Sequence, residues 1–338
     1  LWQTQAEEID TGSLIDLPLE DLMNIPVSGS LTELDPRKTP VSVTTITAED
    51  IAVTPARNLL DLIEIYVPGA MWLSSSSGPL LAIRGVIADR NYKYMVLVNG
   101  IRVNNGIQIG AATELSMWDV GDIEKVEIIR GPGSVTYGPG AIGGVINITT
   151  KNASTAQGVQ TQAFYWNKYI SRGGNISVGM PGKEKEPAIY GFFSMTRSQG
   201  YRPEVWMTNG VDVYYIGSPF NWRHDPQSYF GNFWNDPQYK AYTEVDFKNG
   251  WRFWARYTDS LIPNNTTSSR QMDLRGWPAN ANLMDLIKPV DFYGIQDRQF
   301  ISALEYKLKL NEDFDLQTTF SYTSTELKTV DKWITASK

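Results

Sequence analysis

The sequence of 338 residues contains no cysteine and only one histidine, His224. The absence of cysteine excludes disulfide bonds, thiolate metal sites and cysteine nucleophiles. One imidazole cannot build a multi-histidine metal site, so we interpret His224 as an incidental loop residue. We therefore predict neither a metal centre nor a bound cofactor.

Long apolar runs and basic stripes are also missing. The longest uninterrupted apolar stretches are short, such as Tyr94–Val98, whereas a membrane-spanning helix needs roughly 20 apolar residues. The net charge of −7, without clusters of Lys and Arg, argues against a nucleic-acid partner. The first residues, Leu1–Gln5, lack the basic and apolar regions of a signal peptide, so we expect a chain that is already processed or trimmed.

The first 150 residues predict a small α+β domain. Thr47 and Asp50 have the spacing of a capping box, which marks a helix start, and residues 55–65 show the apolar spacing of a second short helix. Short apolar or β-branched runs bounded by Gly, Asn and Pro predict strands at residues 80–83, 94–98, 123–129 and 145–149.

After Lys151 the hydrophobic period changes to two, as in Trp251, Phe253, Ala255 and Tyr257, so one strand face is apolar and we expect the other to be wet. About seven strands are predicted, near residues 157–166, 173–180, 188–198, 238–248, 250–260, 297–310 and 313–325. Such strands suit either a soluble sandwich or a membrane barrel.

The lengths of the connections separate these two folds. Tight connections at 181–187, 249–250 and 311–313 alternate with long ones at 199–237 and 262–296, and the pair Asn249-Gly250 predicts a type I′ turn. Short turns on one rim and long loops on the other are typical of an outer-membrane barrel. A sandwich has no reason to follow this rule.

One stretch carries a specific resemblance. Residues 123–151, IEKVEIIRGPGSVTYGPGAIGGVINITTK, resemble the signature that ends the plug domain of TonB-dependent outer-membrane receptors. Val67–Gly69, Ile83–Gly85 and Val96–Arg102 match the same family in order and spacing, and Leu17–Val27 resembles the linker before the plug. Asn99 stands where the family usually has Asp.

The glycines of this signature have a physical role beside the resemblance. Glycine permits positive φ and close backbone approach, which are needed where a plug packs against a surrounding wall. The glycines are Gly131, Gly133, Gly138, Gly140, Gly143 and Gly144. A phosphate-binding glycine loop is the competing interpretation. It fails because no Gly-Lys-Ser/Thr ends the run and a strand follows instead of a helix.

The resemblance implies an α+β plug domain followed by antiparallel transmembrane β-barrel strands. We expect a TonB-interacting and linker segment over residues 1–30, the plug over 31–151 and the first part of the barrel over 152–338. The family barrel has 22 strands. A sheet of about seven strands cannot enclose a plug, and its open edges would lie unpaired in lipid. Residues 333–338 also lack the final aromatic common in such barrels, so we expect the other strands to lie outside this sequence or on a second polypeptide.

The implied function is active uptake of a scarce ligand, such as a ferric siderophore or cobalamin, across the outer membrane of a Gram-negative bacterium. TonB, part of an inner-membrane energising complex, would pull on Glu7, Glu8, Ile9 and Asp10. Family arginines at the positions of Arg84 and Arg130 lock the plug to barrel glutamates, which we expect beyond residue 338. Solvated surface arginines are the alternative.

Ligand contacts in the family come from apical plug loops and long extracellular loops. The corresponding residues here are Trp72, Ser74, Ser75, Ser76, Asn104, Asn105 and Gln108 in the plug, and Trp222, Tyr229 and Trp234 in loop 199–237. Flexible loop filler, an interfacial aromatic girdle and packing of the loop on itself are the competing interpretations. The solitary His224 disfavours haem as the ligand.

Two other function classes stay open. A plugged barrel used for surface binding or scaffolding would keep the plug signature and lose the energising segment. An enzyme is poorly supported, because no nucleophile–base pair or carboxylate dyad stands out, so we predict no enzymatic activity.

Overall fold

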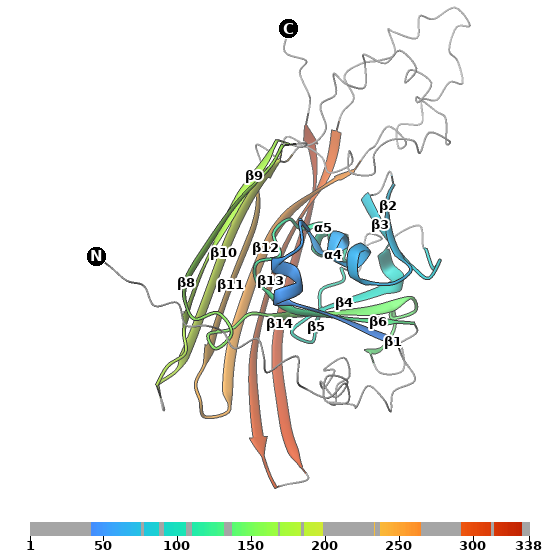
Figure 1. The fold of residues 1–338 in the computed structure, drawn as a ribbon. Coiled ribbons are helices and arrows are strands. Elements are labelled where there is room, and N and C mark those ends of the chain that lie inside the picture. Colours follow the sequence, from blue (N-terminus) through green and yellow to red (C-terminus); the bar gives the residue numbers. More distant parts are fainter. Residues whose placement is uncertain are drawn as a thin grey trace, which may run out of the picture.

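The computed structural model describes residues 42–75, 78–87, 91–105, 110–131, 137–167, 170–183, 186–198, 233, 237–264, 292–311 and 314–332. They form a small mixed domain, which ends with a strand at Thr150, and a tall antiparallel sheet from Gly158 onward (Figure 1). Within these ranges no helix has the length and apolar character needed to cross a membrane.

Both predicted helices of the small domain are present, but the second begins at Leu59 and not at residue 55. In α3 (Ala48–Ala52), the Thr47 hydroxyl accepts the Asp50 N–H at 3.2 Å and the Asp50 carboxylate accepts the Thr47 N–H at 2.9 Å, which confirms the capping box. Helix α4 (Leu59–Tyr66) starts after Asn58, whose side chain accepts the Asp61 N–H at 3.0 Å. It packs into the core through Leu59, Leu60, Leu62 and Ile63.

The centre of the small domain is a five-stranded sheet in the order β1-β6-β7-β4-β5. Its strands are β1 (Ser42–Thr47), β4 (Tyr94–Val98), β5 (Ile101–Arg102), β6 (Ile123–Arg130) and β7 (Gly144–Thr150). Only the β4–β7 pair is parallel. A separate hairpin of β2 (Ala70–Ser75) and β3 (Gly78–Ile83), the 3₁₀ turn η1 (Asn91–Lys93) and α5 (Ala112–Ser116) complete the domain. The predicted strands are confirmed.

The first correction concerns the type I′ turn predicted at Asn249-Gly250. The type I′ conformation falls on Asn99 and Gly100, with φ of 49° and 80°, between β4 and β5. At 249–250 the prediction is wrong: positive φ falls on Lys248 and Gly250, because the connection is longer and Phe247 donates its N–H to the Trp251 carbonyl at 2.9 Å.

The second correction concerns the glycines of the signature. A Cβ on Gly144 would lie 2.7 Å from the Ile129 carbonyl oxygen, and one on Gly143 would lie 2.8 Å from the Tyr94 ring. At these two positions the close approach is therefore made within the small domain, and not to a surrounding wall as we expected. Gly131, Gly138 and Gly140 do adopt positive φ.

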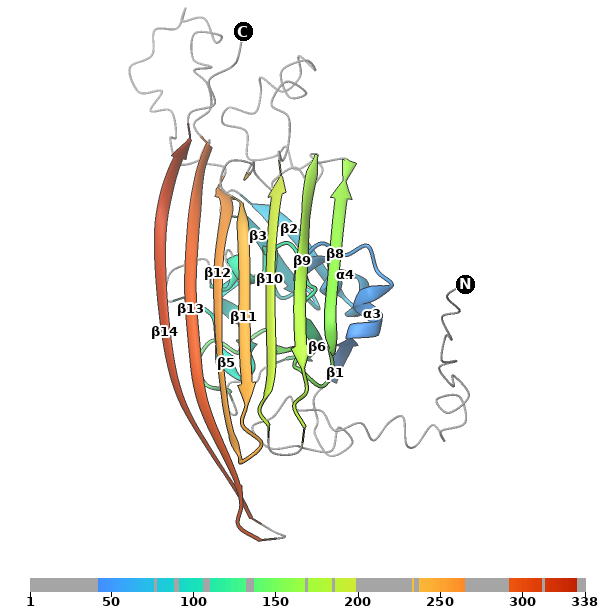
Figure 2. The ribbon, with the colours of Figure 1, turned by 90° about the vertical axis from the view of Figure 1, so that its left-hand side faces the viewer.

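The tall sheet, called the arc below, contains seven strands, each antiparallel to the next in sequence order. They are β8 (Gly158–Trp166), β9 (Ser171–Met180), β10 (Ala188–Ser198), β11 (Gln238–Asp246), β12 (Trp251–Asn264), β13 (Phe292–Lys309) and β14 (Asp315–Lys332). The predicted strands are confirmed, with β12 to β14 longer than expected. Figure 2 shows the arc as a curved wall in front of the small domain.

The two faces of the arc differ in what covers them. Phe193, Phe253, Tyr257 and Phe300 are exposed on the outer face, as a lipid-facing band requires. The alternate residues, including Lys240, Glu244 and Arg256, are buried against the small domain. Our expectation of a wet polar face is therefore wrong in this region, because the small domain covers it.

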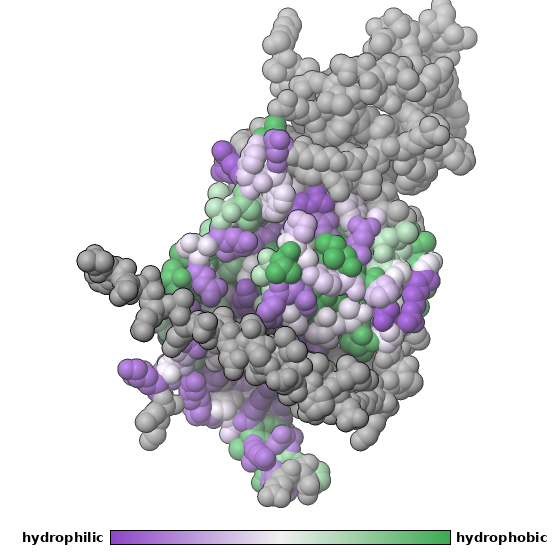
Figure 3. Space-filling view, in the orientation of Figure 1, coloured by the Kyte–Doolittle hydropathy of each residue, from purple (hydrophilic) through white to green (hydrophobic). Residues whose placement is uncertain are grey.

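Figure 3 shows the molecule from the side, in the orientation of Figure 1. Among the coloured residues of this view apolar and polar ones are mixed, without one continuous apolar surface.

Candidate functional site: the interface between the small domain and the arc

Helix α5 and the loop after it bring carboxylates to the inner face of the arc. Glu114 receives two parallel hydrogen bonds from Arg256 of β12, at 2.9 and 2.8 Å. Arg256 is only 2% exposed and Glu114 only 7%, so water does not screen this pair. Two parallel bonds between guanidinium and carboxylate fix orientation as well as adding energy.

A lysine on the neighbouring strand binds the same loop. Lys240 Nζ of β11 lies 2.7 Å from Asp122 Oδ1 and donates to the Asp119 carbonyl at 2.8 Å. Asp122 also lies 3.9 Å from Arg256, so one carboxylate faces two cations. We call Glu114, Asp119, Asp122, Lys240 and Arg256 the anchor cluster.

Asp119 is the most unusual member of the anchor cluster. Its backbone has φ of 82°, and its carboxylate accepts hydrogen bonds from the Gly121 N–H at 2.7 Å and from the Asn175 amide of β9 at 3.0 Å. Burial raises the pKa of the Asp119 carboxyl, and the charge of Lys240 opposes that rise. The cost of burying this acid is thus partly offset by the arc.

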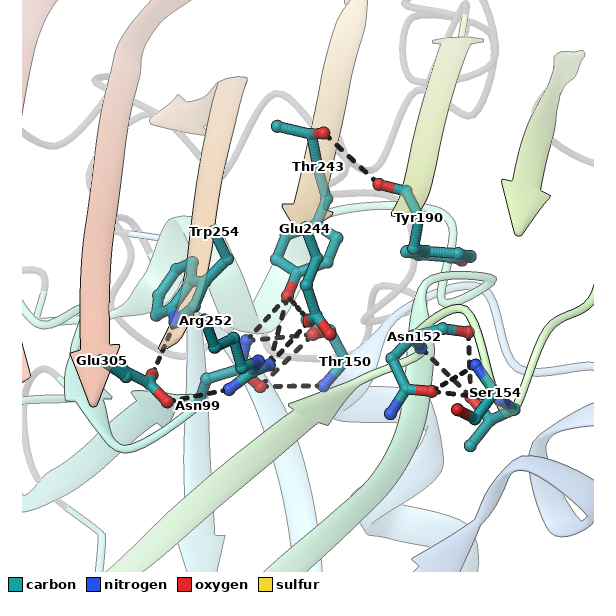
Figure 4. Close-up of polar contacts among 12 residues, drawn as sticks. Asn99, Thr150, Asn152, Ser154, Tyr190, Thr243, Glu244, Arg252, Trp254 and Glu305 are labelled. Carbon is teal, nitrogen blue, oxygen red and sulfur yellow. Dashed lines mark hydrogen bonds and ion pairs between the residues drawn. The ribbon is translucent and has the colours of Figure 1, made fainter. Parts of the chain in front are cut away.

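A second polar cluster lies on β11 to β13 and faces the turn between β4 and β5 (Figure 4). Arg252 is held by Glu244 at 2.7 Å and by Glu305 at 3.1 Å, and Glu305 also accepts the Trp254 indole N–H at 2.7 Å. The Tyr242 hydroxyl donates to Glu244 at 2.5 Å. The arc therefore satisfies most of this cluster by itself.

Asn99 connects the small domain to that cluster. Its amide donates to the Thr150 hydroxyl at 2.9 Å and to the Tyr242 hydroxyl at 3.4 Å, while its carbonyl accepts the Thr150 N–H at 3.1 Å. This is the position at which the family usually has Asp. An amide can donate to both hydroxyls, which a carboxylate cannot do.

Aromatic packing closes the interface near the rim that carries the long loops. Trp118, which is buried, meets Trp166 of β8 edge to face at 5.1 Å and Phe233 at 5.7 Å between ring centroids. The guanidinium of Arg57 lies 5.3 Å from the Trp118 ring centroid. Phe233 is the one aromatic residue of loop 199–237 that the structure describes, and it packs into the core.

The predicted ligand residues are not gathered into one surface. Trp72 is 5% exposed and lies in the core, and the Asn104 side chain is used by the backbone of Val96 and Tyr94, at 2.8 Å each. Asn105 reaches the arc and donates to Asp297 at 3.4 Å. Ser74 and Ser75 lie in β2; Ser76, Gln108, Trp222, Tyr229, Trp234 and His224 lie outside the described residues.

Neither predicted latch arginine meets a glutamate of the described arc. Arg84 is exposed with φ of 52°, and Arg130 is half-buried and donates to the Ser42 hydroxyl. Burial, with the charge of Arg84 second, lowers the pKa of Arg130. Arg130 donates to the Pro68 carbonyl at 3.5 Å and the Arg84 N–H donates to the Gly69 carbonyl at 2.8 Å, so both arginines meet the same turn. The TonB-contact residues Glu7, Glu8, Ile9 and Asp10 lie outside the described residues.

Sequence reasoning missed the anchor cluster. The available signal was the strict alternation of β11 and β12, which puts Lys240 and Arg256 on the polar face, together with Asp119 and Asp122 directly before the glycine signature. Alternation gives the face of a strand but not what covers that face.

The chain was compared with known families and proteins. Residues 35–145 match the family model described as the TonB-dependent Receptor Plug Domain. The vitamin B12 transporter BtuB of Vibrio vulnificus is 36% identical over 121 residues, covering 35% of this chain and 19% of the relative. The ferric enterobactin receptor of Pseudomonas aeruginosa is 38% identical over 125 residues, covering 33% of this chain and 16% of the relative.

Solved structures match over more of the chain. The ferric-catecholate import receptor Fiu of E. coli K12, in its open form, superposes with a TM-score of 0.53 at 16% identity, covering 87% of this chain and 40% of that one. At this identity the match speaks for the fold alone. The chain spans less than half the length of that receptor and under a fifth of the length of the two curated relatives.

These findings define the class of the protein. The chain combines the plug domain of a TonB-dependent outer-membrane receptor with antiparallel strands of a partial barrel, and its place is the outer membrane of Gram-negative bacteria. The small domain is called the plug from here on. The curated relatives are a transporter and a receptor, and neither is named as an enzyme.

Proposed function

We propose that the receptor carrying this chain takes up a scarce ligand across the outer membrane, driven by TonB. The named ligands of its relatives, vitamin B12 and ferric enterobactin, indicate the class: a ferric siderophore, cobalamin or a similar compound. Residues 1–30 would serve as the TonB-interacting and linker segment, 31–151 as the plug and 152–338 as part of a 22-stranded barrel whose other strands lie elsewhere in the receptor or on a second polypeptide. No enzymatic step is part of this proposal.

The anchor cluster is the observation that carries the proposal. Breaking one partner of a buried ion pair costs about 3–5 kcal/mol, because the other charge is left stranded in a dry interior. With two such pairs, Glu114 with Arg256 and Asp122 with Lys240, the plug is held closed in the absence of work. The outer membrane has no ATP beside it, so a mechanical pull from the inner membrane suits this interface.

Arg84 and Arg130 fit a second lock on the uncovered side of the plug. Two arginines that meet the same turn and no described glutamate of the arc are suited to acidic residues on strands other than β8 to β14. We propose this as the family latch. The anchor cluster has the opposite polarity, since there the plug supplies the acids and the arc the bases.

Ligand recognition is proposed for the rim that carries the long connections. Asn105 lies beside Asp297, and its Oδ1 is buried without a hydrogen-bond partner among the described residues. The proposed surface is completed by Ser74 and Ser75 at the end of β2, by Ser76 and Gln108 of the plug, and by Trp222, Tyr229 and Trp234 of loop 199–237. Trp72 and Asn104 are placed to support the plug instead.

The test is energised uptake by cells that express the receptor. Uptake of labelled cobalamin and of ferric enterobactin is measured for the intact receptor and for a deletion of residues 1–15, with surface binding measured separately. We expect the deletion to abolish uptake and to leave binding intact. Unchanged energised uptake would refute the proposal, and binding without uptake by the intact receptor would favour a surface-binding or scaffold protein.

A further inference from the structure

The inner face of β12 to β14 borders the plug loop that carries Asn105. The Asn105 amide donates to Asp297 at 3.4 Å, and the Gln299 amide donates to the Val103 carbonyl at 3.1 Å. Cross-strand partners and alternate residues of a strand share a face, which gives the other members of this surface. We call the following six residues the rim wall, since they lie toward the long connections: Thr258, Ser260, Asp297, Gln299, Thr323 and Thr325.

The rim wall offers almost no charge. Five of its six residues have hydroxyl or amide side chains, and Asp297 is the one ionisable member. The basic residues of the neighbouring inner face, Lys240, Arg252 and Arg256, each lie 2.7 or 2.8 Å from a carboxylate. Their charge is therefore already balanced within the interface, and they leave little positive potential for an anionic ligand.

The sequences of the two long connections have the same character. Residues 199–237 contain two basic and four acidic residues, and residues 265–291 contain three of each. The two connections together are thus net negative. Like charges that meet across an interface repel one another, and the cost grows as water is excluded. This rim is therefore poorly suited to a multiply charged anion.

Two buried oxygen atoms at the rim show which chemistry suits it. Asn105 Oδ1 and Ser260 Oγ are buried without a hydrogen-bond partner among the described residues. An amide oxygen only accepts hydrogen bonds, as does an ionised carboxylate such as that of Asp297, so the ligand must bring N–H or O–H donors. On β14, the exposed Thr323 and Thr325 can donate or accept.

We infer that Asn105 and the rim wall bind an uncharged ligand through its amide or hydroxyl donors. The inference rests on the uptake function proposed above and narrows its ligand class. Cobalamin, with its side-chain amides, and uncharged ferric hydroxamates of the peptide type share this chemistry, whereas a ferric catecholate is a multiply charged anion. A site that hydrogen-bonds an N–H or O–H group discriminates strongly against a ligand that lacks it.

The first test measures surface binding on cells that express the receptor and lack TonB, so that uptake does not contribute. The probes are cyanocobalamin, ferrichrome and ferric enterobactin, of which the last is the anion. We expect one of the uncharged probes to bind about tenfold more tightly than ferric enterobactin, because the charges of the rim and of the anion repel one another. Which of the two binds distinguishes a corrinoid from a hydroxamate.

Three variants test whether the rim wall causes this preference. Asn105→Leu should weaken binding of the uncharged probe about fivefold, since a hydrogen bond is lost, and should not weaken that of ferric enterobactin. Thr325→Arg adds a cation at an exposed position and should raise binding of ferric enterobactin about two- to fivefold. The control is Gln160→Leu, which removes an exposed amide near the start of β8 and should change neither. Heat-dependent electrophoretic mobility checks that each variant is folded.

The inference is overturned if ferric enterobactin binds as tightly as the uncharged probes, or if neither uncharged probe binds. It is also overturned if Asn105→Leu weakens all probes alike or no more than Gln160→Leu does, or if Thr325→Arg leaves binding of ferric enterobactin unchanged. Ferric enterobactin that binds tightly and is taken up would refute the inference and leave the uptake function standing. Tight binding of an uncharged probe without energised uptake would do the reverse.

Discussion

The contact between Glu114 and Arg256 gives the sharpest prediction. Replacing Arg256 by Met keeps most of the side-chain volume but removes the two hydrogen bonds of 2.9 and 2.8 Å to Glu114. It also removes the cation that lies 3.9 Å from Asp122. Glu114 then remains buried without its charge partner, and we expect the plug to be less stably docked by about 3–5 kcal/mol.

That change can be measured as local opening. Hydrogen exchange of the backbone amides of residues 112–122, followed by mass spectrometry in the assembled receptor, reports the free energy of separating this segment from the arc. A loss of about 3–5 kcal/mol corresponds to exchange faster by two to nearly four orders of magnitude. Arg256→Lys, which keeps the charge and loses the paired geometry, should fall between the parent and Arg256→Met.

Two controls make the result interpretable. Lys328→Met removes one partner of the Lys328–Glu326 pair, which is about half exposed on both sides, and should change stability by less than about 1 kcal/mol. The double variant with Glu114→Gln should recover part of the loss, because no stranded charge remains. If Arg256→Met exchanges no faster than Lys328→Met, the anchor cluster does not hold the plug.

Three further predictions follow from the plug. Burial raises the folded-state pKa of Asp119, so the stabilising contribution of its protonation is complete below the unfolded pKa of about 3.9 and is lost as the pH rises through the folded pKa. The Asp119→Asn variant should therefore show a flatter dependence of the free energy of urea unfolding on pH over that window. An unchanged slope would contradict this. Gly144→Ala should destabilise the plug by about 1–3 kcal/mol in urea unfolding, because the new Cβ meets the Ile129 carbonyl oxygen at 2.7 Å, whereas Gly191→Ala, with nothing within 4 Å, is the matched control and should be near neutral. Asn99→Asp removes the amide that donates to the Thr150 and Tyr242 hydroxyls. Hydrogen exchange in the turn between β4 and β5 should accelerate by an amount equivalent to about 1 kcal/mol. Equal rates would show that these bonds do not hold the turn.

The elements of the fold were largely readable from the sequence, because local rules decide them. The capping box at Thr47, the run Tyr94–Val98 and the period of two after Lys151 each act over a few residues, and the structure has a helix or strand at each. The prediction of a two-residue turn at Asn249 was wrong because the register of the two strands sets the length of the connection, and register is not a local property.

The candidate site was not readable in the same way. Glu114 and Arg256 are 142 residues apart, and nothing in either local sequence names the other. Trp72 was assigned to a ligand surface because of its place before a family motif, whereas its indole packs into the core. The rule that polar strand positions face water gave the correct face for Lys240 and the wrong surroundings, because another part of the chain covers it.

The position of β1 at the edge of the plug sheet has a mechanical consequence. Six residue pairs join β1 to β6, from Ser42 with Arg130 to Thr47 with Lys125, and no other strand of the described sheet lies beyond β1. A pulling force on the chain before Ser42 can therefore separate these residue pairs one after another and expose the Ile46 side chain, while β6, β7 and β4 stay paired. Such a domain can be partly unravelled from its margin and can close again on the strands that remain.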